Sequence, residues 1–336
     1  MTETRGSIRQ MYKDGRYTLL QRHQIDDNYW DSCLDQCTYR LPYPYTWWLD
    51  IVSPGWCGLV QYSSEGYSAV FPLPVRRKFG KQLLRQPVFG HQLGLFAQGK
   101  AKPDKESLVR AIDLICHTFP YIDGLALHGT GRYELSGTTL IRHNYLIDLR
   151  QSYNQILNAY AGNRRREISA AAQAGIVVQK TNGPEKMVEV FRKYIEPGIY
   201  GIDGTEYPMF HALFKKWQQM KAVTVYESVL QDQWLAGAAI LRWHNRLIYI
   251  FNASTPEGKR LDALSLLIDR VVAEHAGSNV PLWFDFEAPA SQSVLDYYRR
   301  FGGRKETYHV IHQNNLPQIL KTIQKARKWI VQSFRK

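Results

Sequence analysis

The chain has 336 residues, of which 44% are hydrophobic and 22% charged, and its formal net charge is +13. Because single domains usually hold roughly 100–200 residues, the length favours two domains with separate cores over one domain with extensions. The surplus of positive charge favours an anionic partner, for which nucleic acid, a phosphate-bearing cofactor and an acidic membrane surface all qualify.

The cysteines and the N-terminus narrow the class of protein further. The cysteines have no paired CxxC spacing, and no cluster of histidines supplies the other ligands of a zinc site. No uncharged apolar run reaches 18 residues, and residues 1–20 contain no stretch typical of a signal peptide. We therefore expect a cytoplasmic protein with reduced thiols and no metal. The cysteines are Cys33, Cys37, Cys57 and Cys116.

In the first half, apolar and alternating runs between Gly58 and Phe96 predict three strands, the first two joined into a hairpin by a Ser-Ser-Glu-Gly turn. Residues Asp104–Phe119 carry apolar side chains at helical spacing behind acidic residues suited to a first turn, which predicts a helix. A short buried strand at Gly124–Gly129 and another strand ending near Leu149 follow.

The second half repeats this order. Three antiparallel strands are predicted across Val223–Ser254, followed by a helix at Leu261–His275 and a strand at Pro281–Glu287. A helix at Ser291–Arg300 and a strand from about Lys305 complete the set. The repetition predicts duplication of one α/β unit, although chance recurrence of common α/β elements would give the same order.

Three segments carry a resemblance to a known family. Asn163–Gln179 runs from a basic helix start through small residues to a strand, and Phe284–Arg304 runs from strand through helix to an aromatic-Gly pair and a strand. Tyr43–Val52 is an aromatic-rich helix around Trp-Leu-Asp. Over about residues 20–315 these segments resemble FemABX-like and related GNAT-fold transferases. The resemblance implies an α/β fold, layered as α+β, with two tandem GNAT-like domains, each a mixed, mainly antiparallel sheet flanked by helices.

On this interpretation, residues 1–150 form a non-catalytic N-terminal domain, and residues 151–316 form a C-terminal domain with a connector helix and the active site. Residues 317–336 form a basic amphipathic helix with an apolar stripe. Such a helix suits an anionic membrane surface. Docking of the apolar stripe on the protein itself is the alternative, and we favour it.

The resemblance implies a proton donor in the C-terminal half. Tyr298 and Gly302 have the Tyr-x-x-x-Gly spacing of many GNAT enzymes, in which the tyrosine protonates the departing group. Acyl transfer to an amine needs such a donor, because the leaving group otherwise departs as an unstable anion. Core packing of Tyr297 or Tyr298 is the alternative.

Two carboxylates are candidates for the base that deprotonates the amine. Asp285 and Glu287 alternate on the predicted strand, so their side chains should point to the same face, where burial would raise their pKa values. We expect one of them to act as the base. A structural role, as a helix cap or as an ion-pair partner of Arg299, is the alternative.

The loop that binds the coenzyme A pyrophosphate in GNAT enzymes departs here from the usual spacing. It follows a predicted strand that contains Asn252, and it offers Gly258, Lys259 and Arg260, which with Asn252 are the candidate cofactor-binding residues. The departure agrees with the FemABX-like side of the resemblance, where an aminoacyl-tRNA is the donor. A coenzyme A thioester is the other donor considered, and no tightly bound cofactor is expected. For Lys259 and Arg260, a solvated helix start is the alternative.

Three consecutive arginines, Arg164, Arg165 and Arg166, open the connector helix. Guanidinium groups bind phosphate and carboxylate bidentately, so these residues are candidates for substrate binding. Positive charge is unfavourable at a helix N-terminus, which favours a partner that offsets it. A solvated charged face is the alternative.

Together these residues predict an N-acyltransferase that moves an acyl or aminoacyl group from acyl-coenzyme A or aminoacyl-tRNA to an amine by direct attack. The expected partners are the acyl donor, the amine acceptor and, peripherally, an anionic membrane surface. The alternative is a non-catalytic protein that binds RNA or an anionic lipid precursor on the same duplicated fold.

If the acceptor is a lipid precursor, removing Pro317–Lys336 should abolish co-sedimentation with acidic lipid vesicles, because the removed segment carries six Lys or Arg and no acid. The thermal unfolding midpoint of the remaining chain should stay unchanged. Vesicle binding that survives the truncation would contradict this hypothesis.

Overall fold

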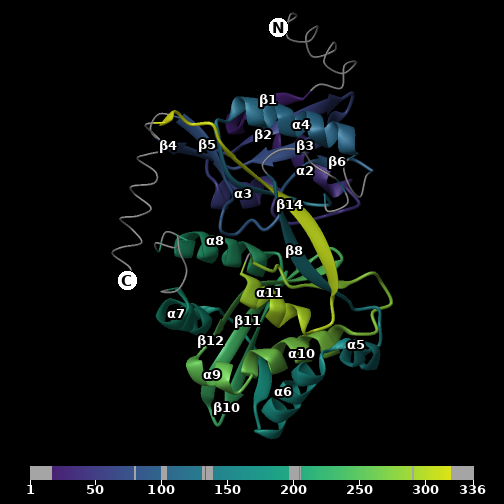
Figure 1. The fold of residues 1–336 in the computed structure, drawn as a ribbon, viewed down its shortest axis with the longest axis vertical. Helices are drawn as coiled ribbons and strands as arrows, with labels where there is room; N and C mark the ends of the chain where they lie inside the picture. Colours follow the sequence, from purple (N-terminus) through teal and green to yellow (C-terminus); the bar gives the residue numbers. More distant parts are fainter. Residues whose placement is uncertain are drawn as a thin grey trace, which may run out of the picture. The chain divides into compact units, whose positions relative to one another are not determined.

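By their contacts, the described residues of the computed structural model form two compact units (Figure 1). Unit 1 takes the chain up to Ile141 and again from Tyr308, and unit 2 is Arg142–Thr307. The sequence predicts domain boundaries after residues 150 and 316, and these boundaries stay predictions. The structure describes residues 17–78, 81–99, 104–130, 133, 139–196, 204, 206–289 and 291–318.

Unit 1 contains an antiparallel sheet in the order β1-β2-β3-β6. The predicted hairpin is confirmed, because β2 and β3 pair antiparallel across a turn at Ser64 and Glu65. The core of this unit is strongly aromatic, and Trp30, Trp48 and Trp56 are fully buried. The elements are β1 (Thr18–Gln21), η1 (Arg22–Gln24), α2 (Asp27–Asp35), α3 (Thr46–Val52), β2 (Cys57–Ser63), β3 (Gly66–Leu73) and β6 (Phe96–Ala97).

The rest of unit 1 contains the predicted helix α4 and a second group of strands. The carboxylate of Asp104 accepts the Ser107 N–H at 2.8 Å and so caps α4, which confirms this helix. The third predicted strand is instead two, β5 and β6, and Pro87, which has no N–H to donate, lies between them. The elements are β4 (Val75–Lys78), β5 (Lys81–Arg85), α4 (Lys105–Thr118) and β7 (Tyr121–Leu127), with β8 (Thr139–Asp148) and β14 (Arg304–Asn314) each running from one unit into the other.

Unit 2 is built on an open mixed sheet in the order β8-β13-β12-β11-β10-β9. Strands β9 to β12 pair antiparallel with their neighbours, which confirms the predicted three-stranded meander, and β13 pairs parallel with β12. The strands are β9 (Val177–Thr181), β10 (Val223–Leu230), β11 (Gln233–Trp243), β12 (Arg246–Ser254) and β13 (Trp283–Asp285).

Helices cover both faces of the unit 2 sheet. One core joins apolar residues of α5, α6, α10 and α11 to the strands, and α10 packs on α6 and β11 (Figure 1). On the other face, Phe191 of α7 and Phe210 of α8 contact Phe251 of β12 at ring-centroid distances of 4.9 and 4.5 Å. The helices are α5 (Tyr153–Ala159), α6 (Gly162–Gln173), α7 (Glu185–Tyr194), α8 (Glu206–Gln219), α9 (Pro256–Arg260), α10 (Ala263–His275) and α11 (Gln292–Arg299).

Two expectations concern the membrane. The predicted C-terminal helix lies outside the described residues from position 319 on, so it stays a prediction. Among the helices that the structure describes, none combines the length and the apolar character needed to cross a bilayer.

The packing of α9 against β11 predicts a stability effect. A Cβ added at Gly258 would lie 2.1 Å from the carbonyl oxygen of Leu235, which is backbone and cannot swing aside. We expect Gly258→Ala to lower the free energy of unfolding by about 1–3 kcal/mol. The control is Gly162→Ala at the first residue of α6, where a Cβ would meet nothing within 4 Å, and its effect should stay below about 1 kcal/mol. Equal urea denaturation midpoints for the two variants would contradict this account.

Candidate active site

Strands β12 and β13 separate after a short stretch of parallel pairing. The pairing joins Arg246–Ile248 to Trp283–Asp285, after which β13 ends while β12 continues to Ser254. Among the described residues, no strand pairs with this side of β12 beyond Ile248. The edge of β12 is therefore open along its second half.

A cavity of about 380 Å³ lies at this end of β12. Its wall is formed by the last residues of β12, by α9 and the start of α10, and by one face of α11. The lining residues are Ile195, Asn252, Ser254, Gly258, Lys259, Asp262, Leu264, Ser265, Ser293, Val294, Tyr297, Tyr298 and Arg300. The cavity thus brings the predicted residues Tyr298, Asn252, Gly258 and Lys259 together.

A β-bulge in β12 turns side chains toward this cavity. Ala239 of β11 is opposite Phe251 and Ile240 is opposite Tyr249, so Ile250 is left without a partner. As a result Tyr249 packs in the core with α10 and α11, whereas Phe251 packs against α7 and α8 on the other face. The next residue, Asn252, lines the cavity.

Tyr298 is buried, with 6% of its surface exposed, yet it lines the cavity. Its ring stacks on Phe286 at 4.7 Å and meets the edge of Tyr249 at 6.0 Å. Burial raises the pKa of this phenol far above its ordinary value, and the nearby Glu287 carboxylate adds to the rise. The Asn252 side chain is near the phenol and partly offsets this rise in pKa. The phenol therefore stays protonated at neutral pH and can donate a proton.

Tyr297 also lines the cavity and belongs to a polar network that the sequence did not reveal. Its hydroxyl is 2.8 Å from Ser265 Oγ, to which Arg164 donates a hydrogen bond. The Arg164 guanidinium lies over the Tyr297 ring, 4.2 Å from the centroid, and pairs with Glu167 at 2.9 Å. Arg164 is fully buried, which lowers the pKa of its guanidinium.

The structure separates the three predicted arginines. Arg164 points into the protein behind the cavity wall, while Arg165 and Arg166 are exposed to solvent. Consecutive residues on a helix point about 100° apart, so they cannot all face one ligand. The expected shared binding surface is not present in this geometry, and the substrate role of each arginine stays a prediction.

The Asp285 carboxylate is buried and is held by an ion pair and hydrogen bonds within the protein. With 3% of its surface exposed, it pairs with Arg246 and accepts a hydrogen bond from Asn144 Nδ2 at 2.7 Å. Its Oδ1 also accepts the Glu287 N–H at 3.0 Å. These contacts match the structural alternative, with Arg246 in place of Arg299.

The two candidate carboxylates do not alternate along one strand. Strand β13 ends at Asp285, and Glu287 follows it with a left-handed φ of +47°. The prediction that Asp285 and Glu287 point to the same face of one strand is therefore corrected, because the chain turns between the two residues. Glu287 lies close enough to Tyr298 to raise the pKa of its phenol, whereas Asp285 is used in the buried ion pair.

The loop after β12 folds into the short helix α9. Thr255 Oγ1 accepts the Gly258 N–H at 2.9 Å, and the Thr255 carbonyl accepts the Lys259 N–H at 2.9 Å. Lys259 is exposed and lines the cavity, whereas Arg260 pairs with Glu257 at 2.5 Å and does not line it. The N–H groups of Gly258 and Lys259 therefore already have partners within the protein.

Sequence reasoning missed Asp262, Ser265 and Arg300, all of which line the cavity. Burial raises the pKa of the Asp262 carboxyl. Arg300 pairs with Glu167 at 2.6 Å. In the sequence, only their position pointed to Asp262 and Ser265. Both stand at the start of a predicted helix, directly after the loop that departs from the usual spacing for coenzyme A binding.

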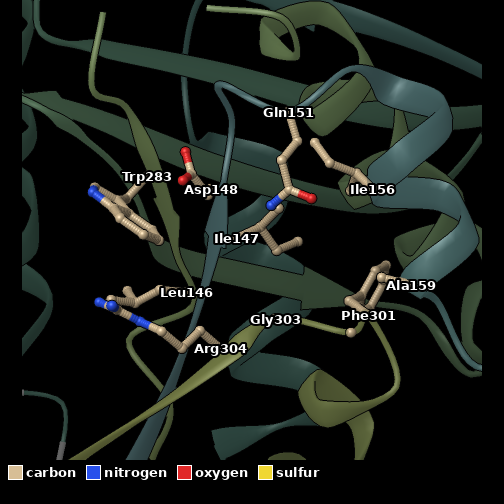
Figure 2. A pocket seen from close by; sticks show the side chains of 11 residues that line it. Leu146, Ile147, Asp148, Gln151, Ile156, Ala159, Trp283, Phe301, Gly303 and Arg304 are labelled. Carbon is tan, nitrogen blue, oxygen red and sulfur yellow. The ribbon is translucent and has the colours of Figure 1, made fainter.

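A second cavity, of about 300 Å³, lies elsewhere in unit 2 (Figure 2). Trp283 and Arg304 lie along one side of it, and Ile156, Ala159 and Phe301 along the other. The Arg304 guanidinium is 4.7 Å from the Trp283 ring centroid. Gly302 of the Tyr-x-x-x-Gly motif lines this cavity, but none of the predicted catalytic, cofactor-binding or substrate-binding residues does.

Comparison with known proteins supports the fold. No protein-family model matches the chain, and no curated protein matches it. Among solved structures, FemX aligns with a TM-score of 0.56 at 12% identity, over 91% of this chain and 99% of FemX. The chain has the fold of FemX. The α/β fold class predicted from the FemABX-like and GNAT-type resemblance is thus confirmed, with open mixed sheets and no closed barrel in the described residues.

Two further structures are more distant. A conserved protein of unknown function from Bacteroides thetaiotaomicron aligns with a TM-score of 0.46 at 9% identity, over 86% of this chain and 98% of its own. The L-PGS of Bacillus licheniformis aligns with a TM-score of 0.43 at 11% identity, over 80% of this chain and 88% of its own.

The buried ion pair at the end of β13 predicts a large effect on stability. Replacing Arg246 by Met leaves Asp285 buried without its cation, which should cost about 3–5 kcal/mol in the free energy of unfolding. The matched control is Arg299→Met, which breaks the exposed pair of Arg299 with Asp296 and should cost less than about 1 kcal/mol. Similar losses in chemical denaturation for both variants would show that the buried pair is not important for stability.

Proposed function

We propose that the cavity beside the open edge of β12 is the site of an N-acyltransferase, which moves an acyl or aminoacyl group to an amine by direct attack. The observation that carries this proposal is the position of the Tyr298–Asn252 pair on the cavity wall, where β12 has no neighbouring strand in the described residues. The FemX-like fold supports it at the level of architecture.

The chemistry needs three contributions. The amine nitrogen attacks the carbonyl carbon, the oxyanion of the tetrahedral intermediate is stabilised, and the leaving oxygen or sulfur departs with a proton while the amine loses one. The open edge of β12 presents backbone N–H groups that suit the oxyanion. Tyr298 suits the leaving group, because its phenol is protonated at neutral pH and lines the cavity.

Of the two carboxylates, Glu287 is the better candidate for the base. Asp285 would have to give up its ion pair with Arg246 and its hydrogen bond from Asn144 to take a proton. Glu287 is half-buried and near Tyr298. In this proposal Asp285 is a positioning residue that fixes the end of β13.

The surroundings of α9 favour aminoacyl-tRNA over coenzyme A as the donor. A pyrophosphate bound at a helix N-terminus needs free backbone N–H groups. Here Pro256 has none, and the N–H groups of Gly258 and Lys259 are bonded to Thr255. Because Arg260 is paired with Glu257, it is poorly placed to compensate. Lys259 remains a candidate for contact with a phosphate of either donor.

Tyr298→Phe is expected to lower the transfer rate by about 10²–10⁴-fold, because the leaving group loses its proton donor. The assay incubates a pool of aminoacyl-tRNA, or acetyl-coenzyme A, with lysine amide and measures the amide product by mass spectrometry. The rate of the unsubstituted protein should not decline with rising pH below about pH 10, because the pKa of the Tyr298 phenol lies above its usual value.

The matched control is Tyr226→Phe, which removes a buried hydroxyl bonded to Glu274 outside the cavity and should keep full activity. Full activity of Tyr298→Phe would refute the assigned role. No amide from either donor, together with RNA binding that weakens steeply with salt, would instead support the alternative of a polyanion-binding protein.

A further inference from the structure

The second cavity of unit 2 has no part in the proposed acyl transfer (Figure 2). Among the described residues, it has no lining residue in common with the cavity of Tyr298. It lies where β8 ends and where β13 and β14 begin, and α5 forms part of its wall. Its volume of about 300 Å³ is at the small end of the range of roughly 300–1,000 Å³ that is typical of small-molecule sites.

Two glycines allow a close approach of the backbone at the edge of this cavity. Gly302 has a left-handed φ of +67°, and a Cβ added there would lie 2.2 Å from the carbonyl oxygen of Ala159 in α5. A Cβ added at Gly303 would lie 2.9 Å from the carbonyl oxygen of Leu146 in β8. The chain that leads into β14 therefore packs directly against α5 and β8.

The two sides of the cavity differ in chemical character. Ile156, Ala159 and the Phe301 ring form an apolar side (Figure 2). On the other side, the Arg304 guanidinium lies over the Trp283 ring, 4.7 Å from its centroid. Attraction to the face of an aromatic ring helps to hold a guanidinium in place, and the N–H groups at the guanidinium edge remain available to a ligand.

The charges beside the cavity leave one cation in excess. Asp148 is the lining carboxylate, and it is paired with Arg150, whose Nε donates a hydrogen bond to Oδ1 at 2.9 Å. Hydrogen bonds from Arg150 lower the pKa of the Asp148 carboxyl, and the charge of Arg304 adds to the fall. No carboxylate of the described residues lies within 4 Å of the Arg304 guanidinium. Two guanidiniums therefore face one carboxylate, and Arg304 carries the surplus charge.

A carboxylate bearing an apolar group matches this arrangement. A guanidinium edge binds a carboxylate through two parallel hydrogen bonds, and the side-chain amide of Gln151, which extends into the cavity in Figure 2, can donate another. A single negative charge balances the surplus of Arg304. A phosphate dianion would exceed this surplus and would meet the like charge of Asp148.

We infer that this cavity is a binding site for a small monocarboxylate with an apolar body. Arg304 and Gln151 hold the carboxylate, and the apolar body contacts Ile156, Ala159 and Phe301. The inference adds a second ligand site to the protein and does not rest on the proposed acyl transfer. Aliphatic and aromatic acids share this chemistry, and the experiment distinguishes between them.

The test measures binding at pH 7 without any acyl donor or acceptor, so its result is independent of transfer activity. Calorimetric titrations use hexanoate for an aliphatic body and benzoate for an aromatic one. The neutral counterparts are hexanamide and benzamide. At least one carboxylate should bind at least tenfold more tightly than its amide, and the tighter of the two carboxylates identifies the preferred body.

Arg304→Gln should lower the carboxylate affinity at least tenfold. Arg304→Lys should retain only part of the affinity, because an ammonium cannot form the two parallel hydrogen bonds. Lys305→Gln removes the same charge from the next residue of β14, which does not line the cavity, and should leave the affinity unchanged. Lys259→Gln removes a cation from the cavity of Tyr298 and should also have no effect. Arg304 is exposed, so its variants should keep the thermal midpoint of the unsubstituted protein.

Absence of carboxylate binding, equal binding of the carboxylates and their amides, or an undiminished affinity of Arg304→Gln would each overturn the inference. Equal losses in Arg304→Gln and Lys305→Gln would do so as well, because they would indicate a general effect of charge. Two further results would contradict it: tighter binding of inorganic phosphate than of either carboxylate, and a loss in Lys259→Gln as large as that in Arg304→Gln.

Discussion

The opening beside β12 depends on one buried polar cluster at the end of β13. Asp285 pairs with Arg246, and Asn144 of β8 donates to Asp285 while its own Oδ1 accepts the Ala288 N–H at 2.9 Å. These bonds fix the chain in a turn directly after a strand of three residues, so β13 cannot extend along β12. Burying such charges costs free energy. The effect of the cluster is to fix the turn that ends β13.

The cavity wall combines a rigid aromatic floor with a few polar groups. Phe286 and Tyr249 pack around Tyr298, and the bulge at Ile250 brings Asn252 onto the same side. Because these rings are buried and closely packed, the phenol is held in one place with a raised pKa. In the proposed reaction Tyr298 would therefore enter as the protonated phenol.

Local patterns in the sequence predicted the elements well and the site in part. Helical spacing identified α4 and α10, and alternation identified β10 to β12, because those signals are set by neighbours a few residues apart. The partners of Asp285 were out of reach, since Asn144 lies 141 residues away in sequence. Burial of Arg164 could not be foreseen either, because it depends on Ser265 and Tyr297 from two other helices.

The most direct test of the central claim is a crystal structure with a stable amide analogue of an aminoacyl-adenosine. The account predicts that the aminoacyl carbonyl lies beside the open edge of β12, within hydrogen-bond reach of the Tyr298 hydroxyl or the Asn252 amide. An analogue bound with its carbonyl in the cavity of Trp283 and Arg304, and none beside Tyr298, would contradict it.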